Sequence, residues 1–222
     1  MDGGKYVSVL SSGRSENSGR IVNQNNEIQK KMTEEIIIAG FGGQGVLSMG
    51  KIMAYSGVMQ DMEVSWMPSY GPEMRGGTAN CITILSDEKI SSPIIASFDT
   101  AIILNQPSME KFAAKVKSGG LLLYDSSTII HAIERTDITI IGIAATTEAI
   151  QMKNPRIMNM LMLGAYLQLK PIVAVDDIMK ALEKVLPEKY HHLLPVNRQA
   201  MERGAALLQL QTEKLPATEV MF

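Results

Sequence analysis

The sequence predicts an α/β fold, with one three-layer domain in which helices cover both faces of a mostly parallel, Rossmann-like sheet. Two observations support this fold class. Short β-branched runs alternate with amphipathic stretches, as in proteins whose parallel strands are joined by helices. The first such run, Ile36–Ala39, leads directly into a glycine turn and a helical pattern. After Ile143 only helical patterns remain, which predicts a C-terminal helical segment.

The length of 222 residues, with 45% apolar and 20% charged residues, fits one domain with a sizeable core. Residues 1–32 are rich in Ser, Gly, Asn and Gln, and we expect them to be a disordered N-terminal extension. The domain is predicted to span residues 33–211. Residues 212–222 are predicted to form a flexible tail.

The composition argues against several classes of function. A formal charge of -2 and the lack of a basic block disfavour nucleic-acid binding. No apolar run reaches the roughly 18 residues of a membrane span, and no signal peptide is apparent, so we expect a cytoplasmic protein without membrane contact. Cys81 is the only cysteine, so this chain cannot supply the four thiolates of an iron–sulfur site. We expect Cys81 to be a buried thiol in a strand.

The hydrophobic pattern predicts the individual elements in order. Strands are expected at 36–39, 62–67, 78–85, 100–104, 121–124 and 138–143, with a short edge segment at 90–95. Helices are expected at 47–59, at 109–117 with Ser108 as its cap, and at 155–169, 175–186 and 195–210. Right-handed crossovers place the first strand beside the strand at 100–104, which makes this pair the expected switch point of the sheet.

The glycine turn carries Gly40, Gly42 and Gly45 at the spacing of a G-x-G-x-x-G phosphate-binding turn, with Gly43 and Gln44 between them. An NAD site also needs an acidic residue at the tip of the second strand. Glu63 stands near the start of that strand and Trp66 near its tip. This disfavours an NAD site but leaves it among the alternatives. The others are a nucleotide-like or other anionic ligand, a partner subunit, and a tight connection that binds nothing.

A second loop, 68–78, contains two prolines and three glycines, which is typical of a shaped binding loop. Arg75 in this loop offers five donors to a carboxylate or phosphate, although a protein carboxylate is an equally good partner. The loops 40–45, 105–108 and 125–128 should share one crevice at the carboxyl ends of the strands. The candidate cofactor-binding residues are Gly40, Gly42, Gly43, Gln44, Gly45, Tyr70, Arg75, Gly76, Gly77, Asn105 and Ser126; no catalytic or metal-ligating residue is assigned.

The run from Gly40 to Val46, the run from Pro68 to Cys81, Ser91-Ser92-Pro93 and Asp99 together resemble the gamma subunit of the 2-oxoacid:ferredoxin oxidoreductases. The resemblance spans essentially Glu34 to Leu210. The run Pro72-Glu73-Met74-Arg75-Gly76-Gly77-Thr78-Ala79-Asn80-Cys81 is most similar to the 2-oxoglutarate branch of this family.

The resemblance implies a subunit of a multi-subunit enzyme that converts a 2-oxoacid to its acyl-coenzyme A and reduces ferredoxin. Thiamine diphosphate and iron–sulfur clusters are then expected in partner subunits, and this chain alone would be non-catalytic and bind no cofactor by itself. Its glycine turn and arginine loop would face coenzyme A or the neighbouring catalytic subunit. A stand-alone nucleotide-dependent dehydrogenase and a ligand-free assembly subunit are the alternatives.

Overall fold

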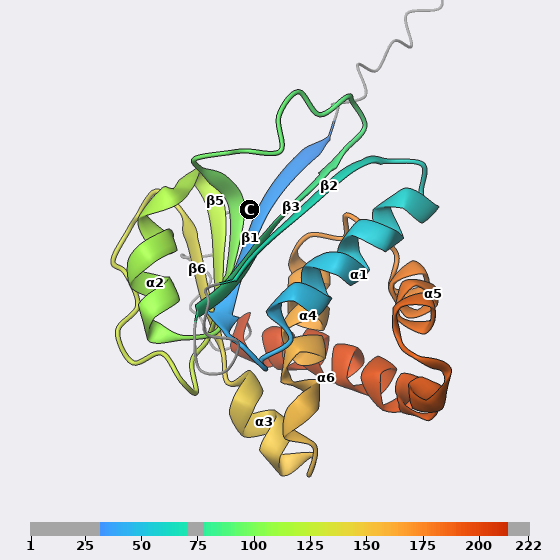
Figure 1. Cartoon of the computed structure of the whole chain (residues 1–222). Helices are drawn as coiled ribbons and strands as arrows, with labels where there is room; N and C mark the ends of the chain where they lie inside the picture. Colours follow the sequence, from blue (N-terminus) through green and yellow to red (C-terminus); the bar gives the residue numbers. More distant parts are fainter. Residues whose placement is uncertain (1–31, 71–77, 213–222) are drawn as a thin grey trace, which may run out of the picture. The chain divides into compact units, whose positions relative to one another are not determined.

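The computed structural model describes residues 32–70 and 78–212 (Figure 1). The predicted extension 1–32 and tail 212–222 lie outside the described residues except for Met32 and Thr212. The backbone of Met32 exchanges two hydrogen bonds with Asp87, each of 3.0 Å.

The core of the fold is one six-stranded sheet with the order β2-β3-β1-β4-β5-β6. Its strands are β1 (Thr33–Phe41), β2 (Glu63–Tyr70), β3 (Thr78–Ser86), β4 (Phe98–Ile103), β5 (Val116–Asp125) and β6 (Thr139–Ile143). β1, β4, β5 and β6 are mutually parallel, whereas β3 runs antiparallel to both β1 and β2. The predicted pairing of the first strand with the strand at 100–104 is confirmed.

Helices cover both faces of the sheet, so the three-layer prediction is confirmed (Figure 1). The helices are α1 (Val46–Met59), α2 (Gln106–Phe112), α3 (Ala145–Gln151), α4 (Met158–Leu169), α5 (Val175–Val185) and α6 (Leu194–Thr212). Short 3-10 turns lie at η1 (Ala113–Lys115), η2 (Pro155–Ile157) and η3 (Glu188–Leu193). Figure 1 shows α1, α4, α5 and α6 on one side of the sheet and α2 on the other.

Alternating residues of β1 enter two separate cores, as the pleat of a strand requires. Ile36 and Ile38 join the large core beneath α1, α4, α5 and α6. Ile37 and Ala39 join a smaller core that includes Met109 and Phe112 of α2. A strand buried on both faces explains why β1 reads as a continuous apolar run rather than an alternating one.

The closest helix contact lies where α4 crosses α6 in the large core. A Cβ at Gly164 of α4 would come within 2.0 Å of the Met201 carbonyl oxygen, and one at Gly204 of α6 within 1.9 Å of the Leu161 carbonyl oxygen. Only glycine permits such an approach, so these two positions fix how the C-terminal helices pack.

An ion pair and hydrogen bonds around Glu34 connect the elements at the amino end of the parallel strands. The buried Glu34 carboxylate accepts hydrogen bonds from Thr100 at 2.5 Å and Lys170 at 2.7 Å, and Tyr166 lies 3.5 Å away. Burial, with Glu34 close by, raises the pKa of the Tyr166 phenol well above its usual value. These contacts join β1 to β4 and to the end of α4, so this edge of the sheet has a structural role.

The expected edge segment at 90–95 is wrong, because these residues form no strand. β3 pairs instead with β1 on one side and with β2 on the other, which leaves no free edge for the returning chain. β2 is longer than expected and contains Pro68. A proline is tolerated there because β2 is the edge strand, where one row of N–H groups has no ladder partner.

The predicted cap and bounds of the helix at 109–117 are also wrong. α2 begins at Gln106, and its cap is Asn105, whose side chain accepts a hydrogen bond from the Ser108 N–H at 2.9 Å. The chain leaves the helix at η1 and enters β5 at Val116. The predicted helix at 155–169 divides into η2 and α4, and α3 was not predicted.

Candidate functional site

The glycine turn after β1 has the backbone that its sequence predicts. Gly43 and Gly45 adopt left-handed conformations, with φ of 98° and 80°. Residues that carry a Cβ rarely adopt this left-handed backbone conformation, so glycine is favoured at both positions. Gly45 is the N-cap of α1, and the first turn of this helix has no side-chain cap and no acidic residue.

Gln44 holds the turn against the neighbouring strand. Its Oε1 accepts a hydrogen bond from the Phe41 N–H at 2.6 Å, and its Nε2 donates to the Leu104 carbonyl at 3.1 Å. The side chain occupies the space that a Cβ at Gly40 would need, since that Cβ would lie 2.6 Å from Gln44 Oε1. The Phe41 N–H is therefore already satisfied within the protein.

The three loops predicted to share one edge do lie together. The Leu104 carbonyl at the end of β4 accepts from Gln44 of the glycine turn and also from the Thr128 hydroxyl at 3.1 Å. Asn105, the next residue, is 2% exposed. Its Nδ2 is buried and has no hydrogen-bond partner among the described residues. Within this part of the chain, the switch point therefore offers one unpaired N–H donor.

A buried carboxylate organises the loop after β5. Asp125 is fully buried and accepts hydrogen bonds from the Ser127 N–H at 3.1 Å and from the Thr146 hydroxyl at 2.5 Å. Ser127 accepts in turn from the Thr147 N–H at 3.0 Å. Ser126 itself is exposed, and its N–H donates to the Ile143 carbonyl. Asp125 thus ties the loop after β5 to the first turn of α3, which follows β6.

Asn159 of α4 is a contact that the sequence did not suggest. A Cβ at Gly45 would lie 2.5 Å from its Nδ2, so this amide packs directly on the glycine turn. A polar residue within the apolar run Met158–Leu163 is the signal that could have pointed to it.

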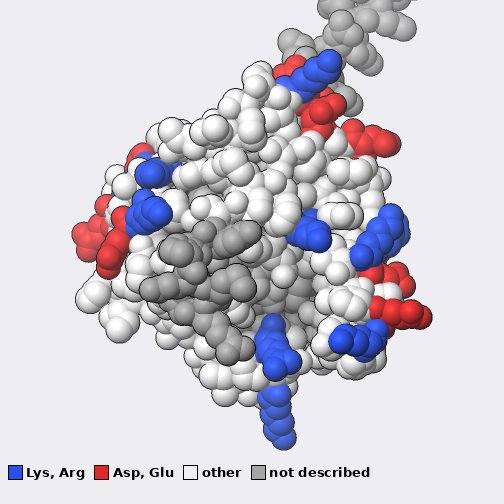
Figure 2. Space-filling model, in the orientation of Figure 1, with Lys and Arg blue, Asp and Glu red and all other residues white. Residues whose placement is uncertain are grey.

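The electrostatics near this edge favour an anion. The first N–H groups of a helix carry partial positive charge, and α1 offers them without an acidic neighbour in its first turn. Lys153 and Arg156, between α3 and α4, are exposed and form no ion pair with the described residues. In Figure 2, the lower middle of the view shows basic side chains and no acidic ones.

The remaining predicted site residues are only partly visible. Tyr70 ends β2, and the position of its side chain is not described. Arg75, Gly76 and Gly77 lie outside the described residues. The structure therefore brings together the glycine turn, Asn105 and the loop that contains Ser126, while the arginine loop remains a prediction from the sequence.

The strand order speaks against an NAD site of the Rossmann type. In that fold the second strand lies beside the first and carries the acidic residue that binds the ribose. Here β3 lies between β1 and β2, and it runs antiparallel to both. The tip of β2 is thus displaced from the glycine turn by a full strand.

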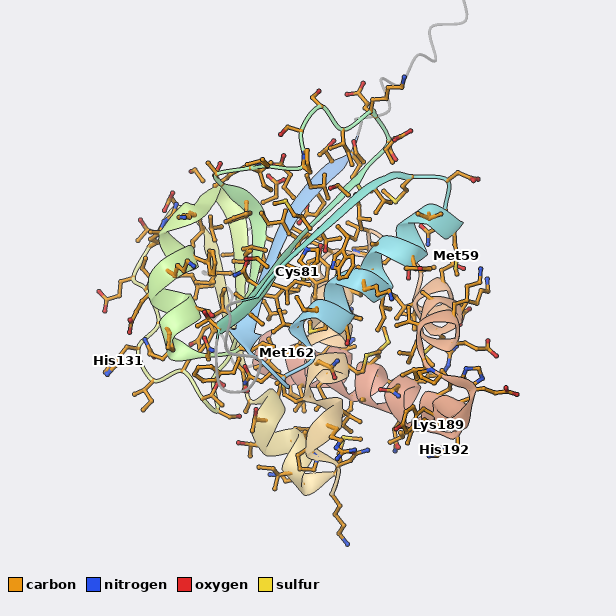
Figure 3. All side chains as sticks on the ribbon, in the orientation of Figure 1. Met59, Cys81, His131, Met162, Lys189 and His192 are labelled. Atoms are coloured by element: carbon orange, nitrogen blue, oxygen red, sulfur yellow. The ribbon has the colours of Figure 1, made fainter. Side chains whose placement is uncertain are left out.

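Cys81 lies in β3 under α1, as Figure 3 shows, and the prediction of a buried thiol is confirmed. Burial raises the pKa of this thiol to about 12, so it stays protonated and is a poor nucleophile. The described residues contain no group of His, Cys, Asp or Glu side chains arranged to hold a metal ion. None of the helices in the described part of the chain has the length and hydropathy of a membrane span.

Comparison with known proteins identifies the family. Residues 35–207 match the model of the pyruvate ferredoxin/flavodoxin oxidoreductase family. The chain belongs to this family. The resemblance to the gamma subunits of 2-oxoacid:ferredoxin oxidoreductases is therefore confirmed, and the fold agrees with it.

Two curated relatives differ in length. The ketoisovalerate oxidoreductase subunit VorA of Methanothermobacter marburgensis is 36% identical over 170 residues, which cover 76% of this chain and 35% of VorA. The 2-oxoglutarate synthase subunit KorC of Methanocaldococcus jannaschii is 33% identical over 166 residues, which cover 73% of this chain and 89% of KorC. The chain thus spans about a third of VorA and most of KorC.

Solved structures give the same result. The gamma subunit of a keto/oxoacid ferredoxin oxidoreductase from Geobacter sulfurreducens matches with a TM-score of 0.66 and 28% identity, over 80% of this chain and 99% of that one. The 2-oxoglutarate:ferredoxin oxidoreductase of Magnetococcus marinus, solved with 2-oxoglutarate, coenzyme A and succinyl-CoA bound, matches with a TM-score of 0.74 and 26% identity. That match covers 82% of this chain and 32% of the other chain.

Proposed function

We propose that this chain is the non-catalytic gamma subunit of an enzyme that oxidises 2-oxoglutarate to its acyl-coenzyme A and reduces ferredoxin. The observation that carries this proposal is the match to KorC, which covers 89% of that 2-oxoglutarate synthase subunit. The run from Pro72 to Cys81 favours the same substrate. A branched-chain 2-oxoacid is the second candidate, because VorA has the higher identity, 36%.

The redox chemistry is assigned to partner subunits. One cysteine cannot hold an iron–sulfur cluster, and Cys81 is buried with a raised pKa. Thiamine diphosphate would supply the decarboxylation in a partner subunit, and iron–sulfur clusters would carry the electrons to ferredoxin. The part left to this chain is to bind or position a group at the carboxyl edge of its sheet.

Coenzyme A is the ligand that we assign to this edge. Its phosphates suit the start of α1, which has no side-chain cap, and the exposed cations Lys153 and Arg156, which form no ion pair with the described residues. The buried Nδ2 of Asn105 needs an acceptor, which an amide carbonyl or phosphate oxygen provides. In this proposal Gln44 shapes the turn and Arg75 adds a charge-assisted contact from the second loop.

The proposal is tested by co-expressing the chain with the other subunits from its own genome and purifying the complex through a tag on this chain. We expect a thiamine- and iron–sulfur-containing complex that reduces ferredoxin only when coenzyme A and a 2-oxoacid are both present. Rates with 2-oxoglutarate, 2-oxoisovalerate and pyruvate then decide the substrate. Purification of the chain without such partners, or oxidoreductase activity of the chain alone, would contradict the proposal.

A further inference from the structure

The described residues cover the two faces of the sheet unequally, and the part that they leave uncovered lies over β2 and β3. On the face under α2, side chains of β1, β3 and β2 form rows across the sheet, because paired residues of antiparallel strands point the same way. One row contains Ile37, Ile82 and Met67. Ile37 is 1% exposed, whereas Ile82 and Met67 are both half-buried. Ile82 packs against the core on the α2 side, and Met67 belongs to neither core. Packing against the core therefore decreases from β1 toward the edge strand.

The reason is the short reach of α2. This helix has seven residues and packs on β1 and β4, whereas the four larger helices lie on the opposite face (Figure 1). We call the uncovered part the bare face and define it as Phe41, Met67, Ser69, Asn80 and Ile82. All five are uncharged, and Phe41 is 37% exposed. In Figure 2, the surface over β2 and β3 is mostly free of charged side chains.

The bare face also continues into the carboxyl edge of the sheet. Phe41 is the last residue of β1 and lies within the glycine turn 40–45, and it pairs with Thr78 at the start of β3. A protein that covered the bare face would therefore also reach the loops assigned to coenzyme A. Depletion of charged residues is typical of the buried centre of a protein–protein interface.

The lengths of the related proteins indicate which kind of partner covers the bare face. The matched segment accounts for 35% of VorA and 32% of the Magnetococcus chain, so in those proteins this domain is one part of a longer polypeptide. Within the described residues, the only helix on this face, α2, packs on β1 and β4 rather than on β2 or β3. In those longer proteins, the polypeptide outside the matched segment could supply an apolar surface that covers the β2–β3 part of the α2 face.

We propose that the bare face docks the subunit equivalent to the part of VorA that this chain does not match, through an uncharged, largely apolar surface of that subunit. The inference rests on the proposed function, since it assumes that such a subunit is present. It adds the location of the interface: the β2–β3 half of the sheet rather than the helical face.

The test introduces charge on each side of the sheet and measures assembly with that co-expressed subunit. Met67→Glu places a carboxylate at the centre of the bare face, and Ser69→Lys adds a charge at an exposed position on the same face. Val58→Glu is the matched control, because Val58 is 61% exposed and lies on α1. Circular dichroism melting of each chain shows whether the variant folds.

We expect Met67→Glu and Ser69→Lys to weaken assembly at least tenfold while melting as the unaltered chain does, and Val58→Glu to assemble normally. Normal assembly of both bare-face variants, or equal loss in Val58→Glu, would overturn the location. Failure of the unaltered chain to assemble would instead overturn the proposed function.

A second experiment removes residues 1–31 and measures hydrogen exchange in the free chain. If the removal raises solvent exchange in β2 of the free chain, the chain's own N-terminus covers the face and the inference is wrong.

Discussion

The sheet face under α1, α4, α5 and α6 is packed as a closed core, whereas the opposite face is closed only where α2 and the connecting loops reach it. Side chains of β1 are buried on both faces, but Met67 of β2 packs against neither core. The helical face therefore supplies most of the core of the domain. In our proposals the other face binds a partner subunit and the carboxyl edge binds a ligand.

The largest effect is expected at the α4–α6 crossing. Gly164→Val places a branched side chain where even a Cβ would lie 2.0 Å from a backbone oxygen, so the two helices must separate. We expect a loss of more than about 3 kcal/mol in the free energy of unfolding, measured by urea denaturation. Gly43→Ala is the control, since none of the described residues lies within 4 Å of the added Cβ and the backbone conformation should cost about 1 to 2 kcal/mol. Equal losses in both variants would show that the crossing is not closely packed.

The carboxyl edge should show a coupled effect at Gly45. Gly45→Ala both strains a left-handed backbone and collides with Asn159, so we expect a cost of about 2 to 4 kcal/mol. In the Asn159→Ala background the two closest contacts are removed and only the Cβ of residue 159 remains, 3.1 Å from the added Cβ, so the cost should fall toward the about 1 to 2 kcal/mol of the strained backbone. The comparison requires four urea titrations. Strictly additive costs would show that Asn159 does not pack on the turn.

The cap of α2 distinguishes two neighbouring polar residues. Asn105→Ala removes the acceptor of the Ser108 N–H and should cost about 1 kcal/mol. Ser108→Ala retains that N–H and should cost clearly less. Thermal melting of the two variants measures the difference. A larger loss in Ser108→Ala would restore the cap that the sequence suggested.

The smallest effect is chemical and leaves the fold intact. Brief treatment of the free chain with hydrogen peroxide should oxidise Met67 on the bare face well before the fully buried Met49 and Met162. Peptide mass spectrometry gives the three rates. Oxidation of Met67 as slow as that of Met162 would show that the bare face is covered in the free chain.

The sequence predicted those parts of the fold that depend on local pattern. Three β-branched residues followed by closely spaced glycines identified β1, the turn and α1, because each depends on residues adjacent in the chain. The partners of β3 were not predictable in this way, since strand pairing depends on contacts between distant segments. The choice between Asn105 and Ser108 also failed, because both residue types cap helices and they are three positions apart.

The candidate site was predicted to a similar extent. The shared edge of Gly40–Gly45, Asn105 and Ser126 followed from the topology of parallel strands. The contact of Asn159 with Gly45 depends on how α4 crosses the glycine turn, and no local pattern encodes that crossing. The close approach at Gly164 and Gly204 was invisible for the same reason.

The most direct test of the proposed role is the dependence of turnover on coenzyme A concentration in the assembled complex. Arg75→Ala removes a charged donor that the sequence places in the second loop. Lys189→Ala is the control, because Lys189 lies in η3 at the corner between α5 and α6, far from the glycine turn (Figure 3). Loss of a charge-assisted contact of about 1.5 to 3 kcal/mol should raise the KM for coenzyme A roughly ten- to a hundredfold and leave the KM for the 2-oxoacid unchanged. An intact complex in which Arg75→Ala and Lys189→Ala both show the unaltered coenzyme A dependence would contradict the assignment of coenzyme A to this edge.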